Sequence, residues 1–77
     1  MTTKEICDYI ELLKINAKAE GKEKLVLVAR DIHKELNLDN RYPMVCSAMR
    51  KCMGDYDVVL FQPPKKDSST VEIEYKL

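Results

Sequence analysis

The sequence predicts a single α+β domain of three helices, one short strand after the first helix and a C-terminal β-hairpin. Residues 3–19 and 41–53 repeat apolar side chains every three or four positions, which is the period of an amphipathic helix. Residues 70–77 alternate apolar and charged side chains, as a strand with one buried face does. A chain of 77 residues has room for one core only.

The composition is that of a folded globular protein without a charge preference. The chain contains 13 basic and 13 acidic residues, so its formal net charge is zero, and 45% of its residues are hydrophobic. No apolar run approaches the ~20 residues of a membrane span, and the first residues lack the unbroken apolar core of a secretory signal. We therefore expect a cytoplasmic protein without membrane contact.

The cysteines give no metal or redox framework. Cys7, Cys46 and Cys52 are odd in number and form no CxxC pair, and His33 is the single histidine. We expect reduced thiols that serve as packing residues. The chain also has no Gly-rich phosphate loop and no set of residues with catalytic or metal-binding spacing. The sequence therefore predicts neither an enzyme nor a bound cofactor.

The first helix is predicted over residues 3–19. Thr2 or Thr3 can cap it, and Glu5 lies in its first turn near the positive end of the helix dipole. Leu12 is expected to widen the apolar face. The main buried stripe consists of Ile6, Ile10, Leu13 and Ala17.

Residues 24–28, KLVLV, are a short apolar run with β-branched residues. Such a run fits a strand or a buried lead-in to the next helix, and we favour the strand. The second helix is expected over residues 28–36, with His33 on its polar, solvent-facing side. Asn37 is a helix-terminating type, and Leu38 is an apolar plug in the joint. The buried face of this helix consists of Ala29, Ile32 and Leu36.

The third helix is predicted over residues 41–53. Pro43 fits only the first turn of a helix, because farther in it would remove a needed backbone donor. Gly54 is expected to close the helix. The buried stripe consists of Val45, Ala48, Met49, Cys52 and Met53.

A hairpin is predicted from strands over residues 57–62 and 70–77. The first strand is β-branched and aromatic, and the second alternates strictly between a buried and a wet face. The connecting segment PPKKDSS is rich in turn residues, and its prolines cannot donate to a ladder. Asp55 and Asp57, ahead of the first strand, are expected to be solvated loop residues.

The order of these elements resembles the winged helix-turn-helix fold, and the resemblance covers nearly the whole chain. Its local basis is ARDIHKELNL followed by PMVCSAMRKCM, which is similar to the family's two helices and their connector. The joint DNRYP is slightly longer than the usual turn. The chain looks most like small bacterial versions of this domain, which occur alone or attached to larger enzymes.

The resemblance implies that the third helix lies in the DNA major groove and that the hairpin, or wing, touches the backbone or minor groove. Arginines and lysines reach phosphates, arginine also reads guanine edges, and Ser47 can bond a base edge. Tyr42 either stacks on the nucleic acid or anchors the joint to the core. Met44 is expected to be exposed, in contact with a thymine methyl group or a protein. The candidate DNA contacts are Arg41, Tyr42, Met44, Ser47, Arg50, Lys51, Lys65 and Lys66.

The distribution of charge favours this surface. Residues 41–66 contain five basic and two acidic groups, net +3, whereas residues 67–77 carry net −2. The basic block therefore coincides with the third helix and the wing. A solvated face with no DNA role would give the same pattern.

Two functions follow as hypotheses. The first is a module that binds double-stranded DNA, as a transcription regulator or an accessory to a DNA-processing system, and it can act as a homodimer. The second is a protein-interaction module that keeps the winged-helix scaffold without binding DNA. The second is favoured by the pI of about 6.6, which is low for a DNA-binding domain, and by Glu72 and Glu74 on the last strand.

Overall fold

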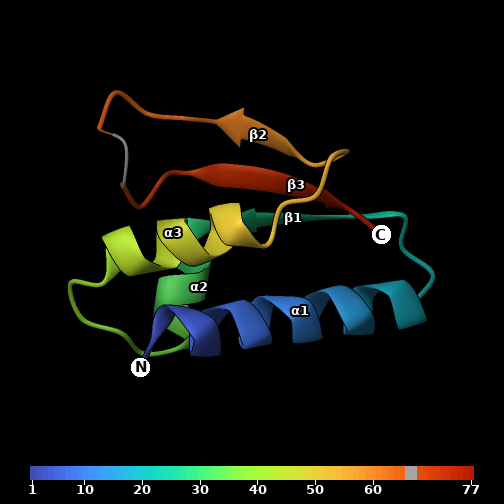
Figure 1. Cartoon of the computed structure of the whole chain (residues 1–77), viewed down its shortest axis with the longest axis horizontal. Coiled ribbons are helices and arrows are strands. Elements are labelled where there is room, and N and C mark those ends of the chain that lie inside the picture. Colours follow the sequence, from blue (N-terminus) through green and yellow to red (C-terminus); the bar gives the residue numbers. More distant parts are fainter. Residues whose placement is uncertain (66–67) are drawn as a thin grey trace.

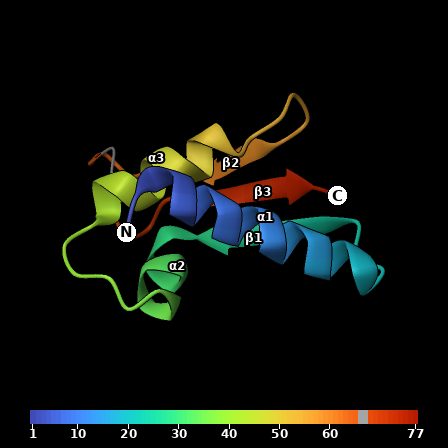
Figure 2. The ribbon, with the colours of Figure 1, turned by 60° about the horizontal axis from the view of Figure 1, so that its bottom comes forward.

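The computed structural model describes residues 1–65 and 68–77 and shows an α+β architecture (Figure 1). The chain forms α1 (Thr3–Ala19), β1 (Lys24–Val28), α2 (Ala29–Glu35), α3 (Tyr42–Lys51), β2 (Val58–Phe61) and β3 (Glu72–Lys76). The strands make one antiparallel sheet in the order β1-β3-β2, and the helices lie on one side of it. α1 packs against α3 and β1 (Figure 2).

These elements confirm the predicted α+β class with three helices and a C-terminal hairpin. The first helix and the short strand have the predicted bounds, and β1 is a strand rather than a lead-in to α2. The second helix lacks only its expected terminal residues, which are its caps. The third helix ends at Lys51 instead of residue 53, and both hairpin strands are shorter than predicted.

α1 begins in a reciprocal hydrogen-bonded cap. The Thr2 hydroxyl accepts the backbone N–H of Glu5 at 3.2 Å, and the Glu5 carboxylate accepts the N–H of Thr2 at 2.9 Å. Both donors would otherwise lack a partner inside the helix. After α1, Gly21 adopts a φ of 85°, which L side chains rarely tolerate. The prediction for Leu12 was wrong, because its side chain is 52% exposed on the side of α1 that faces solvent.

α2 is a short helix whose ends are satisfied by the backbone. The N–H groups of Ala29 and Arg30 donate to the carbonyls of Val71 and Ser69, both at 2.9 Å, so the segment before β3 caps the helix. This arrangement ties the hairpin to the middle of the chain.

The C-terminal end of α2 is closed by a left-handed residue. Asn37 has a φ of 52°, its N–H donates to the Lys34 carbonyl at 3.0 Å, and the N–H of Leu38 donates to the His33 carbonyl at 3.0 Å. This pair of bonds is a Schellman motif. Leu38 packs against the core, as predicted, and the joint then reaches α3 through Asn40, whose φ is also 52°.

α3 is the most buried helix, and its last carbonyls are held by side chains of other elements. Pro43 lies in the first turn, as predicted. The Tyr75 hydroxyl donates to the Met49 carbonyl at 2.7 Å, and Lys14 Nζ donates to the Cys52 carbonyl at 2.6 Å. Such carbonyls have no partner inside a helix, so these donors fix the C-terminal end of α3. The buried residues of α3 are Val45, Cys46, Ala48 and Met49.

The three thiols are free, and those of Cys7 and Cys52 pack where α1 meets α3. The Cys7 thiol donates to the Ala48 carbonyl at 3.6 Å, and the Cys52 thiol donates to the Cys7 carbonyl at 3.8 Å. Burial, followed by the hydrogen bond with Cys7, raises the pKa of the Cys52 thiol to about 12. The Cys52 thiol is therefore held in its protonated form near neutral pH.

The sheet contributes to the core through β3 and the residue before it, because side chains alternate between the two faces of a strand. Val71, Ile73 and Tyr75 are buried against the helices, whereas Glu72 and Glu74 lie on the opposite face. The complete core cluster consists of Ile6, Ile10, Ala29, Ile32, Val45, Cys46, Ala48, Met49, Val71, Ile73 and Tyr75.

Asp57 is a structural residue, which corrects the expectation that it is only solvated. Its carboxylate accepts the N–H of Gly54 at 2.7 Å and the N–H of Lys76 at 2.6 Å. These bonds join the turn after α3 to the end of β3. Asp55, by contrast, is exposed as expected.

The buried Tyr75 hydroxyl provides a test of this packing. Replacing Tyr75 with Phe removes the donor to Met49 and leaves that carbonyl unpaired, so we expect a loss of about 1–2 kcal/mol in the free energy of unfolding. Tyr56→Phe is the control, because Tyr56 is 82% exposed and should change stability by less than about 0.5 kcal/mol. Urea denaturation measures both, and equal stabilities would contradict the assignment.

The same hydroxyl predicts an alkaline loss of stability. Burial, followed by the charge of Cys52, raises the pKa of Tyr75 above its ordinary value of 10.0. The unfolded chain then ionises first, so the contribution of Tyr75 is complete below pH ~10 and falls as the pH rises beyond it. Between pH ~9 and ~11 the wild type should lose stability more steeply than Tyr75→Phe in urea titrations. Parallel pH profiles would contradict this prediction.

Candidate nucleic-acid interface

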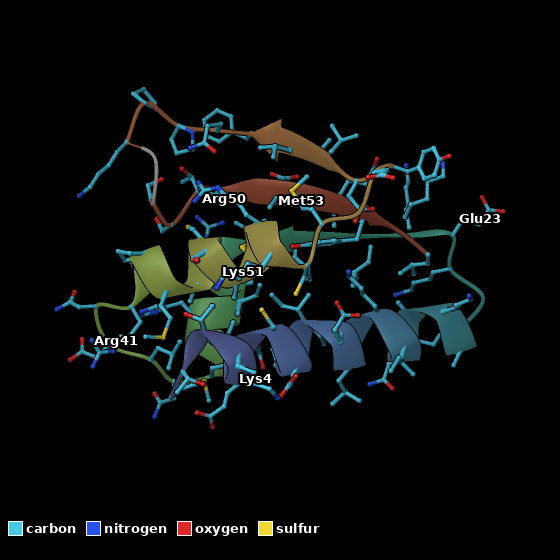
Figure 3. The ribbon with its side chains drawn as sticks, viewed as in Figure 1. Lys4, Glu23, Arg41, Arg50, Lys51 and Met53 are labelled. Carbon is cyan, nitrogen blue, oxygen red and sulfur yellow. The ribbon has the colours of Figure 1, made fainter. Side chains whose placement is uncertain are left out.

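The face of α3 opposite its buried residues forms a polar ridge. We call Pro43, Ser47, Arg50 and Lys51 the outer ridge. Pro43 and Lys51 are exposed, whereas Ser47 and Arg50 are half-buried. Figure 3 shows Arg50 and Lys51 on the C-terminal half of α3. The structure therefore brings three of the predicted contacts, Ser47, Arg50 and Lys51, onto one helix face.

Met44 does not belong to the outer ridge, which corrects its predicted exposure. Its side chain is half-buried and packs against the core cluster. The helical period explains the difference, because residues four apart share a face and Met44 precedes the buried Ala48 by four positions. Met44 is therefore part of the packing of α3, and it no longer argues for a methionine contact at the surface.

Arg41 lies at the other end of α3. It is the N-cap residue of the helix, its side chain is exposed, and Figure 3 shows it in the turn before α3, away from Arg50 and Lys51. Its backbone N–H donates to His33 Nε2 at 3.2 Å. The backbone of Arg41 is thus fixed, while its guanidinium projects from the end of the helix.

His33 and Tyr42 lock the joint between α2 and α3. Their rings stack with centroids 4.1 Å apart and an interplanar angle of 16°. His33 is half-buried and accepts a backbone hydrogen bond, so its expected position on the solvent side was wrong. The stack supports the structural alternative for Tyr42, in which its ring anchors the joint. One face of that ring is covered by His33.

The hairpin approaches α3 through a polar contact. Arg50 Nη2 donates to Gln62 Oε1 at 3.2 Å, which connects the outer ridge to the residue after β2. Pro63 is buried, and Lys65 is exposed. In both ribbon views the loop after β2 lies at the same end of the molecule as the start of α3 (Figures 1 and 2). Lys66, the remaining predicted contact, lies outside the described residues.

The ion pairs between described residues lie on α1, the turn after it, β1, β3 and α2. Within the described residues they join Lys4 to Asp8, Lys14 to Glu11, Lys22 to Glu20, Lys24 to Glu74 and Arg30 to Asp31. None of these pairs includes a residue of the segment 36–65. Arg41, Lys51 and Lys65 are exposed and form no ion pair within the described part of the chain. The segment 36–65 contains four basic and three acidic residues, so it carries one formal positive charge.

Lys14 is a positioning residue that the sequence analysis missed. Its ammonium group bonds the Cys52 carbonyl, forms an ion pair with Glu11 at 3.2 Å and lies 4.5 Å from the centroid of the Tyr75 ring. A signal was present, because Lys14 follows the buried Ile10 by four positions and so shares its face of α1. A lysine on a buried stripe has to place its charge against an acceptor or an aromatic ring.

Comparison with known proteins adds no family to this description. No protein-family model, curated protein or solved structure matches the chain. In the described part of the chain no helix is long and apolar enough to cross a membrane. The described residues also contain no group of three or more His, Cys, Asp or Glu side chains that could hold a metal ion.

The His33–Tyr42 stack predicts a localised loss of stability. His33→Ala removes both the stacked ring and the acceptor for the Arg41 N–H, so we expect the free energy of unfolding to fall by about 1–2 kcal/mol. Lys34→Ala is the matched control, since its exposed side chain forms no ion pair within the described residues. Urea denaturation gives the stabilities, and amide shifts should change mainly at residues 38–44. A neutral His33→Ala variant would show that the stack does not hold the joint.

Proposed function

We propose that this chain is a winged-helix DNA-binding module, with α3 in the major groove and the hairpin loop along the phosphate backbone. The proposal is supported by the element order, which is the order on which the winged-helix resemblance depends. It is also supported by the position of the helices on one side of the sheet, with β2 of the hairpin at one edge of that sheet (Figure 1).

The observation that carries the proposal is the outer ridge of α3. Ser47 lies at its centre, and its hydroxyl can both donate to and accept from a base edge or a phosphate. Arg50 follows by three positions and Lys51 by four, so both cations flank Ser47 on the same face. A guanidinium binds the O6 and N7 atoms of guanine, and an ammonium binds phosphate.

The cations of this surface suit a polyanion better than the net charge suggests. Zero net charge includes an uneven distribution along the chain, because residues 41–66 carry five basic and two acidic groups. Arg41 lies before the start of α3, and the loop that carries Lys65 lies at that same end of the molecule. Contact with about three to five phosphates would give a modest affinity that falls steeply with salt.

The ridge belongs to a helix that is held rigidly. Tyr75 and Lys14 fix the C-terminal carbonyls of α3, and the His33–Tyr42 stack fixes its N-terminal end. A helix fixed at both ends presents its side chains without a further cost for ordering its backbone on binding. This rigidity supports a role for α3 in recognition.

The proposal predicts DNA binding that depends on the ridge. Fluorescence anisotropy with a mixed-sequence duplex at about 50 mM and about 200 mM salt should show binding that weakens with salt. Arg50→Ala/Lys51→Ala should weaken binding about tenfold or more at the lower salt concentration and reduce the salt slope by about 2. Lys51→Glu alone, at an exposed position, should weaken it in the same direction.

The matched control is Lys18→Ala/Lys34→Ala, which removes two exposed cations from α1 and α2. These residues lie off the ridge, so binding should stay within about twofold of the wild type. The absence of binding at the lower salt concentration, or an equal loss in the control, would refute the proposal. Far-UV circular dichroism confirms that each variant is folded.

A protein-interaction module is the second candidate, and the specific observation in its favour is the open face of the sheet. Glu72 and Glu74 lie on that face between apolar neighbours, and Val26 and Val58 flank Glu74 in register. Acidic side chains repel phosphate, so this face suits a protein rather than DNA. Amide shifts confined to β2 and β3 on addition of a protein, with no shifts on addition of DNA, would favour this function over the first.

A further inference from the structure

We propose that two copies of this chain associate through the free edge of β2, whose antiparallel pairing with β2 of the second copy makes one continuous six-stranded sheet. This inference goes beyond the proposed DNA function and depends on other residues. The outer ridge of α3 is not part of the edge.

β2 is an apolar strand that the fold leaves uncovered. All four of its side chains are exposed: Val58 by 49%, Val59 by 37%, Leu60 by 46% and Phe61 by 50%. Tyr56, two residues before the strand, is 82% exposed. In a chain this small, where apolar side chains are needed for the core, five exposed ones within six positions are an unusual patch.

The patch lies along an edge with unused backbone groups. In the described sheet β2 pairs with β3 alone, so alternate N–H and C=O groups of β2 point away from the sheet. Edge strands are commonly protected by a charge, but residues 58–61 carry none. The register shift between Val59 and Phe61 and the two prolines after Gln62 restrict pairing to a short segment. These features favour one short partner strand over open-ended aggregation.

Charge complementarity identifies the partner as a second copy. Asp55 and Lys65 lie five residues before and five residues after Leu60. Both are exposed, and neither forms an ion pair within the described residues. In an antiparallel pair of β2 strands centred on Leu60, Asp55 of one copy and Lys65 of the other lie at the same end of the paired edge, and the two-fold symmetry gives this arrangement twice.

The alternative ways of joining two copies are less favourable. Stacking the open sheet faces would place Glu72 and Glu74 of one copy near the same acids of the other, which is repulsive. The other edge strand, β1, is less apolar at its surface. Its exposed residues are Lys24 and Val26, so only one of the two is hydrophobic. A four-residue edge makes a small interface, so the dimer is weak and depends on protein concentration.

The test is sedimentation velocity on the full chain from about 10 μM to about 1 mM, the range in which a small interface forms. The wild type should shift from monomer to dimer. Val58→Lys/Phe61→Lys should stay monomeric and folded, because the new lysines face Glu74 and Glu72 across the ladder. Leu12→Lys/Ile15→Lys, the matched control on α1, should dimerise like the wild type.

A charge exchange tests the antiparallel arrangement. Asp55→Lys places two cations side by side at each end of the paired edge and should weaken the dimer about tenfold. Asp55→Lys/Lys65→Asp restores opposite charges and should return the dissociation constant to within about twofold of the wild type. A double variant no tighter than Asp55→Lys would overturn this arrangement.

If the lysine variant does not fold, a direct measurement of contacts between two copies tests the proposal instead. A sample that mixes isotope-labelled and unlabelled wild-type chains should show intermolecular contacts between residues 58–61 of two copies. A wild type that stays monomeric at the highest concentration would overturn the proposal. So would a dimer that only the α1 variant disrupts, or a monomer whose β2 pairs with an added extended peptide. Because these experiments contain no DNA, their failure leaves the proposed DNA function to its own test.

Discussion

The buried hydrogen bond from Tyr75 to the Met49 carbonyl is the constraint on which the rest of this small structure depends. It connects the last strand to the C-terminal end of α3, and Lys14 completes the contact from α1 by bonding Cys52 and lying over the Tyr75 ring. A phenol in the core has to find an acceptor, and the unpaired carbonyls of a helix end supply one. Three elements that are distant in sequence are thereby fixed around one helix terminus.

Fixing that terminus determines what the molecule presents on its surface. With α3 held from the sheet side and from α1, the helix can rotate very little, so Ser47, Arg50 and Lys51 stay on the outside. The joint locked by His33 and Tyr42 sets the other end of the same helix. The outer ridge and the packing are therefore linked: the contacts that hold α3 in the core also set which of its side chains face outward.

Periodicity predicted α1 and β3 because each has a buried face, and the period of that face appears in Ile6 and Ile10 of α1 and in Ile73 and Tyr75 of β3. It could not predict residues whose role depends on a partner far along the chain. His33 lies on the polar side of its own helix but is covered by Tyr42, and Asp57 bonds the backbone of Lys76. Met44 was wrongly predicted to be exposed. The ten-residue α3 packs against neighbours on more than half of its circumference, so its buried face is wider than the predicted stripe.

The outer ridge of α3 and the edge of β2 have opposite chemistry, and a hydrogen bond connects the two surfaces. The ridge of α3 is polar and basic, whereas the edge of β2 is apolar, and the Arg50–Gln62 hydrogen bond links the helix to the end of that strand. A change in the position of β2, such as one caused by pairing with a second copy, would therefore act on the guanidinium of the ridge directly. Coupling between two sites requires a physical connection whose state both sites influence. Among the described residues such a connection passes through Arg50, so its side chain is where the proposed association at the edge and the proposed recognition by α3 would meet.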